Sequence, residues 1–370
     1  MPMKFLRRLS AMCLMLTMFL PLCAQAALTT PGKGLCSKTD CFWEMPMDMS
    51  DPDWVWSMLT TPMTVVKGNY RDQQYLYAEK SESSQRIAEV TCATQGVHVL
   101  SQSEDGWSLV ECYSSSFEGS KVKAWNQLVQ GYIRTELLQE VEVNQTWGLV
   151  VDKLSQRLHV FKDGMLLDTL AVSTGYAEPS TPYNESRSGE YLLYSRTGEF
   201  PSGDLFCDYG IRYNDGDLIH EVPHKKYFDE EGNLERVGFY HCEPYLGEKA
   251  SHGCIRVQRL KSSQGINMEW LWDNMYNEVG NIRMVIWEDW PGRTLETPDD
   301  SFVLYYNPKG GDYYHKAETC YGVKTKYLPL TPFTYGELGT SPFDDLEACP
   351  YCCPERRPED IFDINTAHLE

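Results

Sequence analysis

Two Asp-Gly pairs, Asp105-Gly106 and Asp163-Gly164, each lie between two runs in which apolar and polar residues alternate. Asp-Gly in this setting is a strong signal for a β-hairpin, because both residues tolerate the positive φ angles that tight hairpin turns require. Further strand-like runs follow, among them SGEYLLYSR, DLIHEVP and RMVIWED. The MEWLWDNM run has instead the apolar spacing of a helix. The chain is therefore predicted to be mainly β, with one or two helices in its second half.

The N-terminus has the three parts of a secretory signal peptide. Lys4, Arg7 and Arg8 precede a short apolar run, which ends at the small-residue triplet AQA. We therefore expect residues 1–26 to be removed on export, with residues 27–69 forming a linker in which Cys36 and Cys41 could close a small loop. The net charge of −20 argues against nucleic-acid binding, because it repels phosphate. Eleven of the 13 cysteines remain in the exported chain, an odd number that leaves one thiol unpaired.

The segment KASHGCIRV, residues 249–257, has the composition of a cysteine nucleophile site. A thiol reacts as its thiolate, and a nearby histidine can take the proton. Gly253 permits a tight turn, in which the N–H groups of Gly253 and Cys254 can face one oxyanion. From the residues alone, Cys254 could equally be a buried structural cysteine, or a zinc ligand together with other residues between 219 and 254.

This segment belongs to a longer resemblance. YLGEKASHGCIRV, together with VVDKLSQRLHVFKDGMLLDTLAVSTG and STPYNESRSGEYLL upstream, resembles the L,D-transpeptidases of the YkuD type. The resemblance implies a β-rich catalytic domain over residues 145–290 that acts on peptidoglycan stem peptides without a cofactor. By position it implies that Cys254 is the nucleophile and His220 the base, with His252 and Gly253 in the oxyanion turn. It further implies that Arg256 orients the substrate or holds the loop and that Ser251 fills the Ser/Thr place of the motif. We also expect Ser251 and His241 to contact the substrate.

The segment between His220 and Ser251 is longer than in that family, with NLERVGFYHCEP as the apparent insertion. His241, or less favourably His224, could therefore replace His220 as the base. A disulfide between Cys207 and Cys242 could pin this segment over the site. The alternatives to crosslinking are trimming by the same site, as a carboxypeptidase or endopeptidase, and a catalytically silent protein that only binds peptidoglycan.

Residues 70–141 resemble a bacterial SH3-type domain, a small β-barrel that commonly binds the cell wall. The resemblance rests on YLYAEKSESSQRIAEV, GVHVLSQSEDGWSLVEC and GYIRTELL, and YSSSFEGSKVKAWNQLVQ is inserted before the closing strand. Cys92 and Cys112 fall in two of the expected strands and could form a disulfide. We expect a protein of the cell envelope, in the periplasm or cell wall, with no transmembrane segment after signal removal.

The C-terminal region, residues 300–360, forms a small module rich in cysteine and histidine. Its HxxxxC and CxxC patterns predict a structural zinc site with His315, Cys320, Cys349 and Cys352 as ligands. Disulfide pairing is the alternative that export favours. Thr331-Pro332 predicts the start of a helix between the two halves of the pattern.

Overall fold

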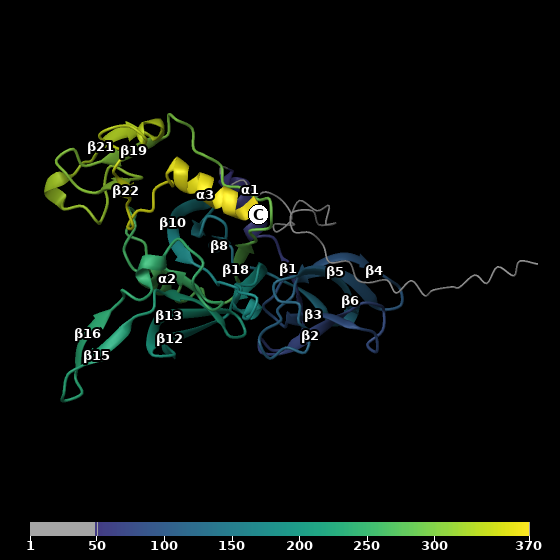
Figure 1. Cartoon of the computed structure of the whole chain (residues 1–370). Helices are drawn as coiled ribbons and strands as arrows, with labels where there is room; N and C mark the ends of the chain where they lie inside the picture. Colours follow the sequence, from purple (N-terminus) through teal and green to yellow (C-terminus); the bar gives the residue numbers. More distant parts are fainter. Residues whose placement is uncertain (1–48, 50, 370) are drawn as a thin grey trace, which may run out of the picture.

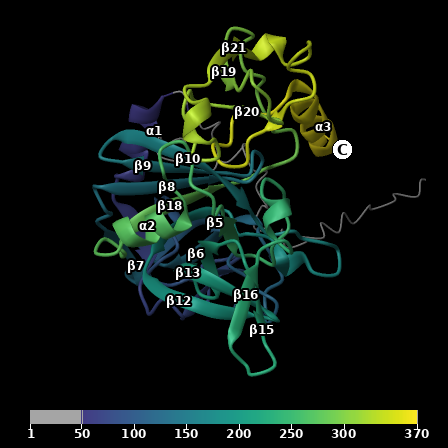
Figure 2. The same ribbon diagram turned by 90° about the vertical axis from the view of Figure 1, so that its left-hand side faces the viewer.

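The computed structural model describes residue 49 and residues 51–369 (Figures 1 and 2). The predicted signal peptide, Cys36, Cys41 and most of the predicted linker lie outside these residues. The prediction of a mainly β protein is confirmed. In the part of the chain that the structure describes, no helix is both long enough and apolar enough to cross a membrane.

A nine-stranded sheet forms the centre of the molecule, in the order β11-β18-β8-β9-β10-β17-β14-β13-β12. The Asp163-Gly164 hairpin forms as predicted, because both residues adopt positive φ and join β9 to β10. The strands are β8 (Trp147–Asp152), β9 (Arg157–Lys162), β10 (Met165–Ser173), β11 (Gly189–Leu193), β12 (Ser195–Ser202), β13 (Leu205–Asn214), β14 (Asp217–Glu221), β17 (Ile255–Val257) and β18 (Ile282–Trp287).

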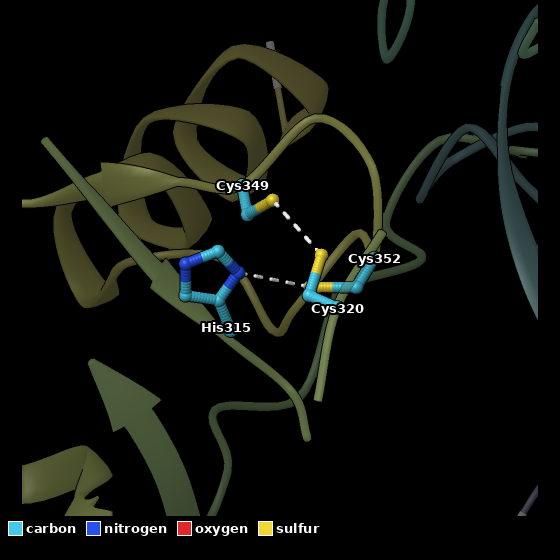
Figure 3. A group of neighbouring side chains, drawn as sticks. All are labelled: His315, Cys320, Cys349 and Cys352. Atoms are coloured by element: carbon cyan, nitrogen blue, oxygen red, sulfur yellow. Dashed lines mark hydrogen bonds between the residues drawn. The ribbon is translucent and has the colours of Figure 1, made fainter. Parts of the chain in front are cut away.

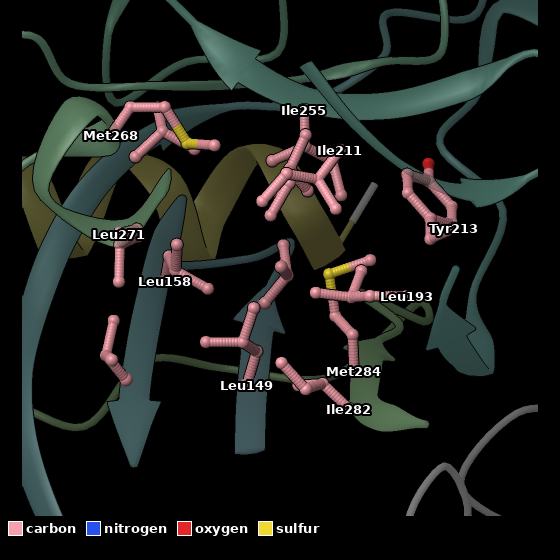
Figure 4. Packing of buried hydrophobic residues seen from close by; sticks show 14 of the residues in the cluster. Leu149, Leu158, Leu193, Ile211, Tyr213, Ile255, Met268, Leu271, Ile282 and Met284 are labelled. Atoms are coloured by element: carbon pink, nitrogen blue, oxygen red, sulfur yellow. The ribbon is translucent and has the colours of Figure 1, made fainter. Parts of the chain in front are cut away.

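One face of this sheet carries the main hydrophobic core. The predicted helix forms as α2 (Met268–Asn274), and Asn267 caps it by accepting a hydrogen bond from the N–H of Trp270. Met268 and Leu271 of α2 pack against side chains from the strands (Figure 4). The core members labelled there are Leu149, Leu158, Leu193, Ile211, Tyr213, Ile255, Met268, Leu271, Ile282 and Met284.

Strand β17 joins the two halves of the sheet. It pairs antiparallel with β10 and parallel with β14, in a register that sets Ile255 opposite Ile219 and Arg256 opposite His220. Ile219 and Ile255 are fully buried in the core. Because side chains alternate along a strand, His220 and Arg256 lie toward the other face.

Part of the predicted linker is structured. Residues 51–69 contain α1 (Pro52–Leu59) and β1 (Met63–Val66), and Asp51 caps α1. Val55, Met58 and Leu59 are spaced i, i+3, i+4, so they form an apolar stripe, which packs on the central sheet. Residues 51–69 are therefore part of the folded protein, because the apolar stripe of α1 is buried against the central sheet.

The N-terminal region forms a five-stranded antiparallel sheet in the order β3-β2-β6-β5-β4, and β7 pairs with β1. Cys92 and Cys112 are both buried in its core as free thiols, so the predicted disulfide is not formed. The SH3-type assignment stays a prediction. The strands are β2 (Gln73–Tyr77), β3 (Arg86–Thr91), β4 (His98–Gln102), β5 (Trp107–Tyr113), β6 (Leu128–Arg134) and β7 (Leu138–Val141).

Buried hydrogen bonds dock this sheet on the central one. The N–H of Gly96 donates to the carbonyl oxygen of Glu190 at 2.9 Å, and the N–H of Leu192 donates to that of Thr94 at 2.8 Å. The segment YSSSFEGSKVKAWNQLVQ, inserted before the closing strand, also contacts the central sheet region. The carbonyl oxygen of its Ser116 accepts a hydrogen bond from Arg187 Nε at 3.0 Å. The N-terminal region is therefore attached across a defined contact.

The C-terminal region forms a four-stranded sheet in the order β21-β19-β20-β22, followed by α3 (Pro358–Leu369). The prediction of a helix at Thr331-Pro332 is wrong, because these residues begin β21 and pair with β19. Proline is tolerated there because β21 is an edge strand. The strands are β19 (Val303–Tyr306), β20 (Tyr313–His315), β21 (Thr331–Thr334) and β22 (Glu347–Ala348).

The inserted segment between β14 and β17 contains a hairpin of β15 (Lys225–Phe228) and β16 (Leu234–Gly238). This hairpin projects from the end of the molecule opposite the C-terminal module (Figures 1 and 2). The extra length that the sequence contains at this point therefore extends outward, and β14 and β17 remain adjacent.

Candidate active site at Cys254

The turn before Cys254 is held by hydrogen bonds on both sides. Gly253 has φ +120°, which a residue with a side chain rarely adopts. Its carbonyl oxygen accepts hydrogen bonds from Ser186 Oγ at 2.7 Å and from the Tyr213 hydroxyl at 3.3 Å. Its N–H donates to Ser251 Oγ at 3.2 Å, and Ser251 Oγ in turn donates to the carbonyl oxygen of Cys254. The Gly253 N–H that we assigned to an oxyanion is thus bonded to Ser251 in this structure.

Cys254 is partly buried and lies directly before β17. Burial and the Asp217 carboxylate raise its pKa to about 12. A hydrogen bond from the Leu218 N–H and the charges of Arg256 and Arg187 act in the opposite direction but do not outweigh them. The side chain is therefore a neutral thiol at neutral pH, so it needs a base to react as a nucleophile.

Arg187 and Asp217 form a buried ion pair whose charges both act on the thiol. Burial raises the pKa of Asp217, although the Arg187 guanidinium opposes this. Arg187 also contacts the inserted segment through Ser116. Neither residue was predicted from the sequence, although Arg187 lies within STPYNESRSGEYLL, one of the segments that carry the family resemblance. Asp217 has no distinguishing pattern, because it reads as an ordinary residue at the start of a strand.

His220 lies on β14 with 3% of its surface exposed. Its Nδ1 is 2.6 Å from the carbonyl oxygen of Glu221, and a carbonyl can only accept, so Nδ1 carries the proton. Nε2 therefore has the free lone pair. Burial lowers the pKa of His220 to about 4, an effect that the hydrogen bond to Glu221 opposes and the Arg256 charge adds to. At neutral pH this imidazole is uncharged and can accept a proton.

The other predicted histidines have different surroundings. His252 is exposed beside Gly253. His241 is exposed beyond β16, with its ring 4.2 Å from that of Tyr240. His224 is buried, and its Nδ1 lies 3.2 Å from Asp208 Oδ2. The register in which β14 pairs with β17 therefore places His220 opposite Arg256, two residues after Cys254.

Arg256 lies among the groups on this face of the sheet. Burial lowers the pKa of His220 and raises those of Cys254, Cys207 and Cys242, and the Arg256 charge adds to the first effect and opposes the other three. Cys207 and Cys242 are buried free thiols, so the predicted disulfide between them is not formed. Burial raises the pKa of Cys207 to about 12, and the nearby Cys254 makes a smaller contribution in the same direction.

The C-terminal module brings all four predicted metal ligands together (Figure 3). Their ligand atoms all lie within 4.8 Å of one another, and all four residues are buried. Cys320 Sγ is 3.8 Å from Cys349 Sγ, and Cys352 Sγ is 3.6 Å from His315 Nδ1. The Cys254 site and this group are separate clusters.

Comparisons with known proteins match the central part of the chain to one family model. Residues 146–286 match the family model of the YkuD L,D-transpeptidase catalytic domain. No curated protein matches the chain. A solved L,D-transpeptidase from Mycobacterium tuberculosis H37Rv is 17% identical with a TM-score of 0.28, over 53% of this chain and 96% of its own. Another, from Xylanimonas cellulosilytica, is 18% identical with a TM-score of 0.26, over 40% of this chain and 64% of its own. The match to the family model is confined to residues 146–286, the central part of this chain.

Proposed function

We propose that the protein is an exported L,D-transpeptidase that crosslinks peptidoglycan, with Cys254 as its nucleophile and His220 as its base. The observation that carries this proposal is the pairing of β17 with β14. It sets His220 opposite Arg256, two residues beyond Cys254, with Nδ1 engaged and Nε2 free to accept a proton. A base held on a strand has a fixed side-chain direction, which suits general-base catalysis better than a position in a loop.

The chemistry begins from a neutral thiol and a neutral imidazole. His220 Nε2 takes the thiol proton as Cys254 Sγ attacks the carbonyl carbon between the diamino acid and the terminal D-alanine of a donor stem peptide. The proton then passes to the departing amine of D-alanine, and a thioester remains on Cys254. The amine of a second stem peptide attacks this thioester, forms the new amide bond and releases the thiol.

Three groups support the thiolate as it forms. The Leu218 N–H donates to the sulfur, and the positive charges of Arg256 and Arg187 act on it. We assign Arg256 a second role, in binding a substrate carboxylate, because guanidinium groups bind carboxylates in a two-pronged geometry. Ser251 holds the turn through its hydroxyl, which accepts from Gly253 and donates to the carbonyl oxygen of Cys254.

Acylation by a carbapenem tests the proposal, because the family resemblance implies this class of covalent ligand. Intact-mass measurement should find one adduct on the wild type and none on Cys254→Ala. Cys353→Ser is the matched control and should acylate as the wild type does, because Cys353 lies in the C-terminal module. Failure of the wild type to form an adduct would favour the silent, peptidoglycan-binding alternative.

The reaction with a disaccharide tetrapeptide then separates crosslinking from trimming. Mass spectrometry of the products should find a crosslinked dimer together with released D-alanine. A tripeptide product without any dimer would identify water as the acceptor, and the enzyme would then be a carboxypeptidase.

A further inference from the structure

We propose that His315, Cys320, Cys349 and Cys352 bind one Zn²⁺ ion, and that this ion fixes the loops by which the C-terminal module docks on the catalytic sheet. The proposal is independent of the reaction at Cys254.

The spacing of the four ligand atoms fits a zinc ion. Tetrahedral zinc lies about 2.3 Å from sulfur and about 2.0–2.1 Å from nitrogen, which requires edges of about 3.8 Å between sulfurs and about 3.5–3.6 Å between sulfur and nitrogen. The Cys320–Cys349 and Cys352–His315 distances are 3.8 Å and 3.6 Å. Three sulfurs and one imidazole form a donor set that zinc prefers, and the burial of all four indicates a closed structural site.

The fold of the module assembles the site. Strands β20 and β22 pair in parallel with Tyr314 opposite Ala348, so His315 and Cys349 emerge together at the same end. The Gly322 N–H donates to Cys320 Sγ at 3.4 Å, a contact that stabilises a metal-bound thiolate. A disulfide would use two of the three sulfurs and leave a buried thiol and the imidazole without a shared partner.

Residues next to the ligands form the contacts with the catalytic sheet. Lys316, which follows His315, donates to Asp168 Oδ1 of β10 at 2.7 Å. Cys353, which follows Cys352, donates from Sγ to Gln258 Oε1 at 3.1 Å.

Gln258 also links the module to the strand of the nucleophile. Its Nε2 donates to the carbonyl oxygen of Tyr351 at 3.0 Å, and the residue directly follows β17. Tyr321 and Tyr351, each beside a ligand, line a groove of about 490 Å³ with Glu221 and Arg259 of the catalytic domain. A metal that holds both loops therefore orders several docking contacts at once, the nearest of them four residues beyond Cys254.

Metal analysis of the full chain, purified without chelator, tests the binding. We expect one zinc ion per chain in the wild type and in Cys353→Ser, the matched control, and less than about a tenth of that in Cys320→Ser and Cys352→Ser. Because these two variants could fail to fold, the wild type is also stripped with a chelator and titrated with Co²⁺. A visible spectrum of tetrahedral, thiolate-bound cobalt supports the site. Folded wild type without bound metal, or with Cys320 in a disulfide, overturns it.

Thiol labelling and limited proteolysis test the docking role. Removal of the metal should expose Cys320, Cys349 and Cys352 to alkylation and make the connection between residues 290 and 303 sensitive to protease. Lys316→Ala should keep its zinc yet show the same increase in cleavage, because it loses the contacts with Asp168 and Thr169 but none of the four ligands. Unchanged cleavage after complete metal removal would refute the docking role and leave the zinc site itself intact.

Discussion

Replacing Glu190 with glutamine should weaken the contact between the N-terminal sheet and the catalytic sheet. The Glu190 carboxylate is buried on β11, where His98 Nε2 of β4 lies 2.7 Å from one oxygen and Arg283 Nε of β18 donates to the other at 2.5 Å. Arg283 Nη1 also donates to the carbonyl oxygen of Met58 in α1, at 2.6 Å. One carboxylate thus connects the N-terminal sheet, the central sheet and α1.

The pKa of Glu190 sets the size of the effect. Burial acts to raise this pKa, but the Arg283 charge and the hydrogen bond with His98 outweigh it and lower the pKa from 4.5 to about 2. At about 1.4 kcal/mol per pKa unit, the ionised carboxylate contributes about 3 kcal/mol to the free energy of unfolding. Because the folded-state pKa is the lower one, this contribution is present above pH 4.5 and is lost as the pH falls toward about 2.

Urea unfolding at several pH values, monitored by tryptophan fluorescence, measures the contribution of Glu190 to the free energy of unfolding. Glu190→Gln should lose about 3 kcal/mol at pH 7 and show a smaller further loss than the wild type between about pH 5 and pH 2. The matched control is Glu140→Gln on β7, an exposed position that should unfold as the wild type does. Equal stability of Glu190→Gln and the wild type at pH 7, or parallel pH dependences, would refute the reasoning.

Three further predictions concern the site and the N-terminal region. His220→Ala should slow carbapenem acylation of Cys254 by about 10²–10⁴-fold, the usual effect of removing a general base, whereas His241→Ala should weaken substrate binding more than chemistry. Loss of acylation in His241→Ala alone would exchange the two roles. Alkylation of Cys254 by iodoacetamide, read by peptide mass spectrometry, should rise about tenfold per unit between about pH 7 and pH 10, because its pKa is raised to about 12; a plateau below about pH 9 would contradict this. A fragment of residues 63–141, which includes β1, should remain soluble and sediment with purified peptidoglycan, and sedimentation of only the rest of the chain would place wall binding elsewhere.

Much of the architecture could be predicted from the sequence because the signals are local. Alternation of apolar residues, the Asp163-Gly164 turn and the apolar spacing of 268–275 depend on neighbouring residues only, and each feature forms where it was predicted. The Thr331-Pro332 prediction failed for the converse reason. A proline after threonine suits the first turn of a helix, but here the pairing of β21 with β19 decides the conformation.

The residue types of the candidate site could also be predicted from the sequence. Which of these side chains lie near one another in the folded protein could not. Ser-His-Gly-Cys identifies a nucleophile candidate, but three histidines were possible bases. The parallel pairing of β14 with β17 places His220 opposite Arg256, and its role as the base stays a prediction. Arg187 and Asp217 could not be found, because an ion pair between residues 30 positions apart exists only once β11 and β14 are placed in the same sheet.

The sequence by itself determined a mainly β chain, a cysteine motif and four residues suited to bind a metal, since alternation and short spacing specify each of these. The catalytic domain followed from the resemblance to a family. Only the tertiary structure decided that residues 51–69 are folded, that Ser116 of the N-terminal region contacts Arg187, and that the C-terminal module docks beside β17. These contacts join residues far apart in the chain, and their partners are set by which buried surfaces and hydrogen-bonding groups are complementary in three dimensions.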